Sequence, residues 1–149
     1  MTPEDVDLFS KIVKERSGLV VSPNKAYLLE SRLLPVARRH ELGDLEALAA
    51  AVRSSSPEAI LEDITEAMTT NETFFFRDIG PFDRFRENIL PPLLENRAAS
   101  KSLRIWCAAA STGQEPYSLS IILMEMASQL AGWKVEIIGT DISNEALNK

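Results

Sequence analysis

The sequence predicts an α-helical bundle followed by a single βαβ unit, and three observations lead to this fold class. Residues 1–68 contain four runs of apolar residues at helical spacing, separated by stops rich in glycine, serine and proline. Two short apolar runs, residues 103–107 (LRIWC) and 133–139 (WKVEIIG), are typical of strands. A longer apolar run at residues 115–130 lies between them, and the order strand, helix, strand implies parallel pairing with a right-handed crossover.

The helices of the bundle begin and end at recognisable signals. Residues 2–5 (TPED) offer an N-cap, a proline in the first turn and acidic side chains, and Gly18 ends this first helix. The second helix runs from Ser22 to about His40, and Pro35 within it predicts a kink near residues 31–35. Two further stops precede the third and fourth helices: residues 43–44 (GD) and residues 54–57 (SSSP).

The pattern changes after the fourth helix. Residues 69–77 (TTNETFFFR) are polar and then aromatic, without helical periodicity, and we expect at least two of the three phenylalanines in the core. Another helix opens at residues 80–81 (GP) and is broken or bent at residues 91–92 (PP). We therefore predict three regions: residues 1–78, a helical domain; residues 79–102, a linker helix region; and residues 103–149, an incomplete α/β domain. A last helix is expected to start at residue 144.

Composition excludes several classes of protein. Hydrophobic residues make up 45% and charged residues 26%, which is an ordinary globular balance. No apolar run approaches the roughly 20 residues of a membrane span, so we expect no membrane insertion. The net charge of −6 argues against non-specific binding of nucleic acid.

Cysteine usage and the N-terminal residues point to the cytoplasm. Cys107 is the only cysteine, which excludes an internal disulfide and a cysteine-rich zinc site. His40 is the only histidine, so no metal site is predicted. Cys107 follows an apolar strand and is expected to be a buried small residue rather than a nucleophile. Glu4 and Asp5 stand where a secretion signal needs positive charge, so we expect a cytoplasmic protein.

The loop between the first strand and the long helix suggests a cofactor site. Residues 108–113 (AAASTG) have small side chains, and the N–H groups of a helix start bind anionic oxygens. Asp141 ends the second strand, where a carboxylate accepts hydrogen bonds from ribose hydroxyls. Together these features predict a nucleoside-containing cofactor. The structural alternative is that the small residues permit tight packing and Asp141 caps the next helix.

The loop does not match the common nucleotide fingerprints. Gly113 stands alone where a dinucleotide fold needs three glycines, and Asp141 follows it by more than the roughly 20 residues of that fold. A Walker lysine is also missing. Glu115 at the helix start would repel a pyrophosphate but suits a cationic group. An acidic pocket of this kind fits S-adenosylmethionine better than a dinucleotide.

Three motifs, residues 69–77 (TTNETFFFR), 105–120 (IWCAAASTGQEPYSLS) and 139–143 (GTDIS), resemble those of CheR-type chemotaxis receptor methyltransferases. The resemblance covers the whole chain. It implies a helical N-terminal bundle and the first βαβ unit of a Rossmann-like α/β methyltransferase domain, truncated here. The positions it assigns to binding of S-adenosylmethionine are Asn71, Thr73, Arg77, Glu115 and Asp141.

The resemblance implies transfer of a methyl group from S-adenosylmethionine to glutamate side chains in the cytoplasmic methylation region of chemoreceptors, leaving S-adenosylhomocysteine. A glutamate carboxylate has a pKa near 4.3 and is ionised at neutral pH, so this chemistry needs no general base. Catalysis then depends on orientation. We assign Arg77 a catalytic role in orienting the carboxylate or the cofactor, because a guanidinium does not act as an acid or base.

The second helix carries a basic face. Lys25, Arg32 and Arg39 are spaced seven residues apart, and Arg38 lies close by. A solvated charged face is the simpler interpretation. The resemblance implies instead that Arg32, Arg38 and Arg39 dock on the acidic methylation region of the receptor, although Pro35 is not expected within such a helix.

Two other functions stay open at this point. One is a non-catalytic module that binds a receptor or senses the cofactor. The other is a nicotinamide-dependent oxidoreductase, which Glu115 and the missing glycines disfavour. Two strands leave open sheet edges and an incomplete cofactor pocket. We therefore expect the chain to be a piece of a longer enzyme and to be poorly active or inactive alone.

Overall fold

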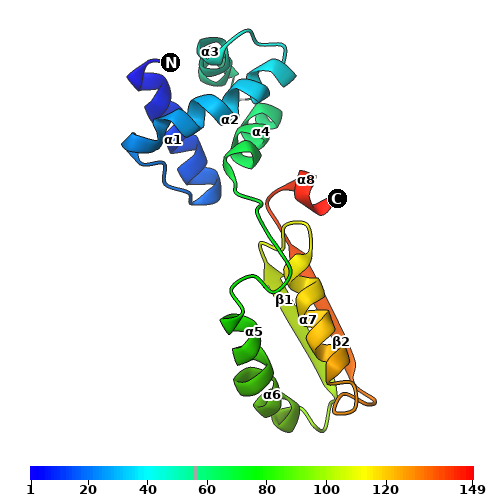
Figure 1. Ribbon diagram of the computed structural model, residues 1–149. Coiled ribbons are helices and arrows are strands. Elements are labelled where there is room, and N and C mark those ends of the chain that lie inside the picture. The colour runs from blue at the N-terminus through cyan, green and yellow to red at the C-terminus, as the bar shows by residue number, and fades with distance from the viewer. Residues whose placement is uncertain (56) are drawn as a thin grey trace. The chain divides into compact units, whose positions relative to one another are not determined.

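The computed structural model describes residues 1–55 and 57–149, which form two compact units, residues 1–70 and 71–149 (Figure 1). Along the chain, the boundary between the units follows residue 70, whereas the sequence predicts that the helical domain extends to residue 78. Hydrogen bonds explain the difference, because the hydroxyl of Ser111 donates to the Asn71 carbonyl and the Phe76 N–H donates to the hydroxyl of Ser118. These bonds attach the segment after residue 70 to the second unit.

The first unit contains the four predicted helices within the residues that the structure describes: α1 (Pro3–Ser17), α2 (Ala26–Arg39), α3 (Leu45–Ser55) and α4 (Glu58–Met68). Thr2 caps α1 as expected, and Gly18 ends it. The second helix starts later than predicted, after a short 3₁₀ turn at Pro23–Lys25, and it continues through Pro35. The stop before α4 includes Ser56, which lies outside the described residues.

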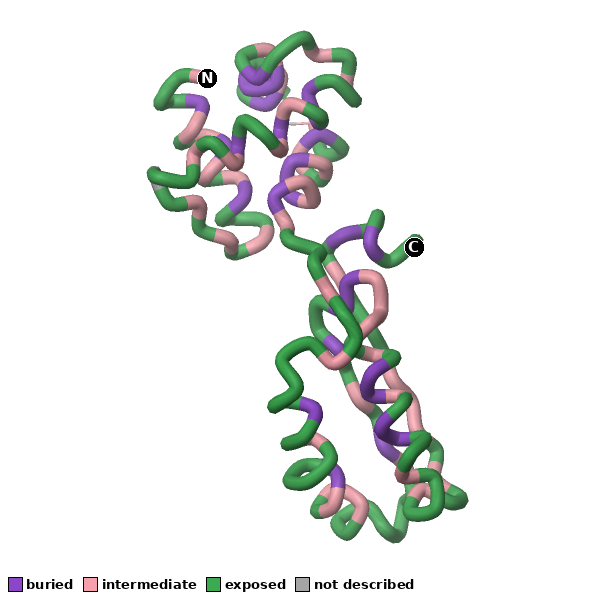
Figure 2. The backbone as a smooth tube through the Cα atoms, in the orientation of Figure 1, coloured by how far each residue is buried: buried purple, intermediate pink, exposed green. Residues whose placement is uncertain are grey.

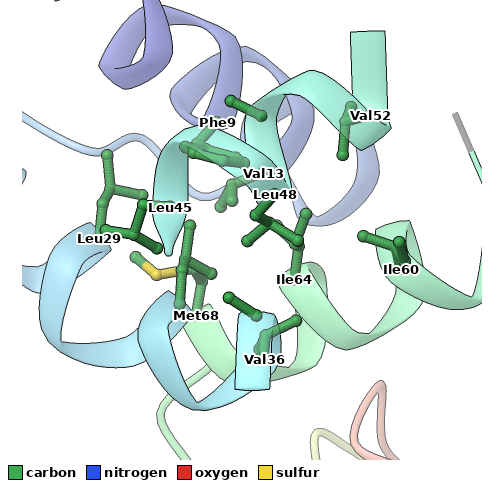
Figure 3. Packing of buried hydrophobic residues seen from close by; sticks show 13 residues of the cluster. Phe9, Val13, Leu29, Val36, Leu45, Leu48, Val52, Ile60, Ile64 and Met68 are labelled. Carbon is green, nitrogen blue, oxygen red and sulfur yellow. The ribbon is translucent and has the colours of Figure 1, made fainter. Parts of the chain in front are cut away.

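Buried apolar side chains from all four helices meet in one core, seen close up in Figure 3. Phe9 and Val13 of α1 and Ile64 of α4 are fully buried. Leu29 and Leu33 of α2 are equally inaccessible. This apolar packing stabilises the short helices, which are marginal in isolation.

A charged network ties the start of α1 to α3. The Asp5 carboxylate accepts hydrogen bonds from the Thr2 N–H at 2.9 Å and from the Arg53 guanidinium at 2.6 Å, and Asp5 is only 2% exposed. The bond from Thr2 and then the bond from Arg53 hold the pKa of the Asp5 carboxyl below its usual range. The ionised form of Asp5 therefore stabilises the folded unit.

This network predicts a pH-dependent stability. Because the folded pKa of Asp5 is lowered, its contribution is present above the unfolded value, near pH 3.9, and is lost as the pH falls through the folded value. We expect Asp5→Asn to lower the midpoint of thermal unfolding at pH 7, with a difference from wild type that shrinks as the pH approaches 3. Asp7→Asn, an exposed position on the same helix, is the control and should change little. Equal midpoints for Asp5→Asn and wild type at pH 7 would contradict the assignment.

The second unit confirms the predicted βαβ arrangement. Strands β1 (Ser102–Ala108) and β2 (Lys134–Thr140) pair in parallel, with Ile105 opposite Ile137. Helix α7 (Gln114–Glu125) lies between them in sequence and along the sheet in space (Figure 1). It ends before the predicted residue 130, because hydrogen-bonded turns follow Glu125. A short helix, α8 (Asn144–Leu147), comes after β2.

The prolines at residues 91–92 do not break the preceding helix. Helix α5 (Gly80–Arg84) passes through one π-helical turn at Phe85–Ile89, and α6 (Leu90–Asn96) follows directly. Pro91 and Pro92 occupy the first turn of α6, where a missing N–H removes little hydrogen bonding. The irregularity in this helical stretch is the π-helical turn, which lies just before the two prolines.

One face of the sheet is covered and the other is open. Leu103 and Cys107 of β1 are buried beneath residues of α5, α6 and α7, and Figure 2 shows purple segments on the strand and on α7. On the opposite face Trp106 is 68% and Ile138 is 37% exposed.

Within the part of the chain that the structure describes, no helix has the length and apolarity to cross a membrane.

Candidate functional site

Asp141 joins the two loops that follow the strands. One carboxylate oxygen of Asp141 accepts the Ser111 N–H at 2.7 Å, and the other accepts the Ser143 N–H at 2.8 Å. The Ala110 N–H adds a bond of 2.9 Å to the carbonyl of Thr140. The loop after β1 is thereby fixed to the end of β2, at the edge of a parallel sheet where ligands bind in such folds.

The loop after β1 has an unusual backbone. Ala109 and Ser111 adopt left-handed conformations with φ of 65° and 51°, which non-glycine residues adopt rarely and at an energetic cost. Gly113 has φ of 99°, and a Cβ there would stand 3.2 Å from the Tyr117 ring. At Gly139 the reason is space rather than backbone conformation, because an added Cβ would lie 2.9 Å from the Cβ of Ala110. Small residues therefore serve close packing here, as the structural alternative proposed.

A second segment, residues 71–77, lies against this loop. The Ser111 hydroxyl donates to the carbonyl of Asn71 at 2.7 Å, and the Phe76 N–H donates to the Ser118 hydroxyl at 2.9 Å. Ser111 is 8% exposed and Ser118 is fully buried, so these bonds are protected from water. The structure thus brings two predicted site residues, Asn71 and Asp141, to the same buried serine.

Arg77 is exposed and held by its own segment. Its guanidinium carbon lies 5.2 Å from the centroid of the Phe74 ring, and its Nη1 donates to the Glu72 carbonyl at 2.5 Å. The carboxylate of Asp78 is 3.9 Å from its Nε. Thr73, in the same segment, is half-buried. The roles predicted for Thr73 and Arg77 stay predictions.

The expectation that at least two of the three phenylalanines lie in the core is wrong. Phe74 is 51% and Phe75 is 56% exposed, while Phe76 packs edge-on against Phe82 with ring centroids 5.4 Å apart. Phe76 takes a left-handed backbone with φ of 54° in a turn, so the three rings cannot share one buried face.

Glu115 lies in the first turn of α7, close to Cys107 at the end of β1. Burial, and then the charge of Glu115, raise the pKa of the Cys107 thiol to about 11. Cys107 is 2% exposed. The thiol is therefore protonated at neutral pH and buried, as the sequence predicts, and it is a poor nucleophile.

The carboxylates and small side chains at these loops are compatible with S-adenosylmethionine. A carboxylate has about four acceptor positions, and the two N–H bonds of Asp141 leave room for ribose hydroxyls. The exposed carboxylate of Glu115 suits a cationic group. Ala108 and Ala109 are exposed and small, which lets a ligand approach the backbone.

Sequence reasoning did not single out Ser111 and Ser118. Both are buried hydroxyls that join residues 71–77 to the βαβ unit. Ser118 also donates to the Gln114 carbonyl at 2.6 Å. For Ser118 the available signal was its place among the apolar residues of the long helix, where a buried hydroxyl needs a partner.

The predicted docking residues in the first unit differ in their surroundings. Arg32 is half-buried, and its Nη1 donates to the carbonyls of Met68 at 2.9 Å and Thr69 at 3.1 Å. Arg39 pairs with Asp63 at 3.1 Å. Arg38 is exposed. Arg32 therefore holds the end of α4, and the docking roles predicted for the three arginines stay predictions.

Comparison with known proteins gives two family matches. Residues 4–69 match the all-alpha domain of CheR methyltransferase, and residues 71–149 match its S-adenosylmethionine-binding domain. The two matches divide at the same place as the compact units. The cofactor of the second domain is S-adenosylmethionine.

Three curated relatives of the chain are each named as a chemotaxis protein methyltransferase. The chain is 36% identical to chemotaxis protein methyltransferase 1 of Pseudomonas aeruginosa over 96% of this chain and 53% of the relative. It is 36% identical to a chemotaxis protein methyltransferase of Vibrio anguillarum (94% and 50%) and 32% identical to one of Borreliella burgdorferi (100% and 54%). The chain spans about half the length of these relatives. It belongs to the CheR methyltransferase family.

Proposed function

We propose that the protein transfers methyl groups from S-adenosylmethionine to glutamate side chains in the cytoplasmic region of chemoreceptors, and that it works in the cytoplasm. The observation that carries the proposal is the meeting of residues 71–77, the loop after β1 and Asp141 at Ser111. In this assignment the first unit recognises the receptor, and the second binds the cofactor. Because the chain spans about half of its relatives, we expect it to be inactive alone.

We assign cofactor binding to Asn71, Thr73, Arg77, Glu115 and Asp141. Asp141 would bind the ribose hydroxyls, and Glu115 would lie near the cationic part of the ligand. When bound, S-adenosylmethionine supplies an activated methyl group and leaves as S-adenosylhomocysteine. Support for the two acidic roles comes from their places beside the carboxyl ends of β1 and β2.

The substrate carboxylate needs orientation rather than activation. A glutamate side chain with a pKa near 4.3 is ionised at pH 7, so no general base is required. Arg77 carries five N–H donors, and the Glu72 carbonyl takes one of them. Arg77 would use its remaining donors to hold a carboxylate oxygen in place, since planar guanidinium groups suit two-point binding of carboxylates.

Transfer of a radioactive methyl group tests this function. The intact protein, a cytoplasmic receptor fragment and methyl-labelled S-adenosylmethionine should give labelled receptor, and mild alkali should release the label as methanol, because esters hydrolyse and N-methyl groups do not. Residues 1–149 alone should give no label. A protein that binds S-adenosylhomocysteine but labels no receptor would instead be a cofactor-sensing or receptor-binding module.

The docking role of α2 has its own test. Arg38 is exposed in the last turn of α2, so we expect Arg38→Glu to weaken receptor binding about tenfold or more without changing the affinity for S-adenosylhomocysteine. Lys14→Glu, also exposed in the last turn of a helix, controls for net charge. Arg32→Glu is unsuitable, because it would remove two bonds to the end of α4. Equal effects of Arg38→Glu and Lys14→Glu on receptor binding would refute docking through α2.

A further inference from the structure

We propose that Phe74 is a positioning residue whose ring holds the guanidinium of Arg77 in one place for an incoming carboxylate. The guanidinium carbon lies 5.2 Å from the ring centroid, within the range in which the electron-rich ring face attracts a cation. The meaning of this contact for catalysis rests on the proposed function of Arg77. The contact itself does not depend on that function.

Both side chains come from one turn of the backbone. The Arg77 N–H donates to the Phe74 carbonyl at 3.3 Å, and Phe76 inside this turn has a left-handed φ of 54°. The turn places the ring and the guanidinium on the same side of the segment. The Ser118 hydroxyl holds this turn by accepting a hydrogen bond from the Phe76 N–H at 2.9 Å.

Two further contacts restrict the guanidinium. Nη1 donates to the Glu72 carbonyl at 2.5 Å, and the Asp78 carboxylate is 3.9 Å from Nε. Together with the ring of Phe74, they give the group three neighbours: one at Nη1, one near Nε and one at its face. Neither of these two contacts involves Nη2, so we assign its donors to the incoming carboxylate. A pre-positioned arginine loses less conformational freedom when it binds.

The exposure of Phe74 fits this role. A core phenylalanine would be buried, yet Phe74 is 51% exposed, and its neighbour Phe75 is 56% exposed. Within residues 71–77 as the structure describes them, Arg77 makes its cation–π contact with Phe74. Phe75 therefore offers a matched control, adjacent in sequence, equal in chemistry and similar in exposure.

Nuclear magnetic resonance tests the contact without any substrate. An aromatic ring shifts the resonances of protons above its face, so the Arg77 Hδ and Hε signals should lie upfield of those of other exposed arginines. In Phe74→Leu they should return to ordinary values, and in Phe75→Leu they should stay shifted. Unshifted Arg77 signals in the wild-type protein would overturn the proposal.

Kinetics of the intact protein test the consequence. We expect Phe74→Leu to lower kcat for methyl transfer by about two- to fivefold, from the strength of a cation–π contact between exposed side chains. Because the positioning role concerns the donors of Arg77 that orient the substrate carboxylate, we expect the KM for S-adenosylmethionine to change less than kcat. Phe74→Tyr should restore kcat toward wild type, and Phe75→Leu should stay near it.

The possible failures are distinguishable. If the wild-type protein is active and Phe74→Leu and Phe75→Leu have the same kcat, the positioning role is refuted and the proposed function stands. If the wild-type protein transfers no methyl group, the proposed function fails, and the positioning role that rests on it fails too, even where the Arg77 resonances show the contact. A fall in kcat that Phe74→Tyr does not restore would show a packing effect and would also refute the proposal.

Discussion

Asp141→Ala is expected to weaken binding of S-adenosylhomocysteine by about 30- to 1,000-fold, or roughly 2–4 kcal/mol. Two losses add in this variant. The acceptor that we propose for the ribose hydroxyls is removed, and the N–H groups of Ser111 and Ser143 lose the carboxylate that holds the two loops together. Ser111 is buried, so its N–H would be left without this partner in a place that water reaches poorly. Isothermal titration of the intact protein measures the affinity.

The matched control for this variant is Asp83→Ala, an exposed acidic residue on α5 in the same unit. It should leave the affinity unchanged. Circular dichroism of both variants checks that the fold is retained. If Asp141→Ala bound S-adenosylhomocysteine as tightly as wild type, Asp141 would have neither the ribose role nor the loop-holding role in cofactor binding.

Arg77→Lys is expected to lower the rate of methyl transfer by about a hundredfold, because lysine keeps the charge but loses the planar two-point geometry. The variant would also lose the arrangement over the Phe74 ring and the fork that reaches the Glu72 carbonyl. Initial rates with the receptor fragment as substrate measure this effect.

Arg84→Lys, exposed on α5, is the corresponding control and should have the wild-type rate. The affinity of Arg77→Lys for S-adenosylhomocysteine separates two possible roles of Arg77. A slow rate with normal affinity indicates orientation of the substrate carboxylate, whereas a parallel loss of affinity indicates cofactor binding. A wild-type rate for Arg77→Lys would remove Arg77 from the catalytic site.

Local signals made most of the fold predictable. The cap at Thr2, the stop at Gly18 and the apolar periods between them depend on neighbours within a few residues. The two strands and α7 follow from runs of apolar residues, and their order implies the parallel pairing that the structure shows. The family was also predictable, because the motifs in residues 69–77 and 105–120 are long.

The remaining features depend on tertiary contacts that periodicity does not report. Phe74 and Phe75 are exposed because the left-handed turn at Phe76 directs only one ring into the core. Arg32 belongs to a charged face by spacing, yet its guanidinium caps the end of α4, far along the chain. The hydroxyl of Ser111 gains its importance only when residues 71–77 fold back on the loop.

The most direct test of the central claim, that residues 71–149 contribute to an S-adenosylmethionine site, is titration of the intact protein with S-adenosylhomocysteine and, separately, with NAD. We expect saturable binding of S-adenosylhomocysteine at one site and no measurable binding of NAD. Binding of NAD alone, or of neither ligand, would contradict it.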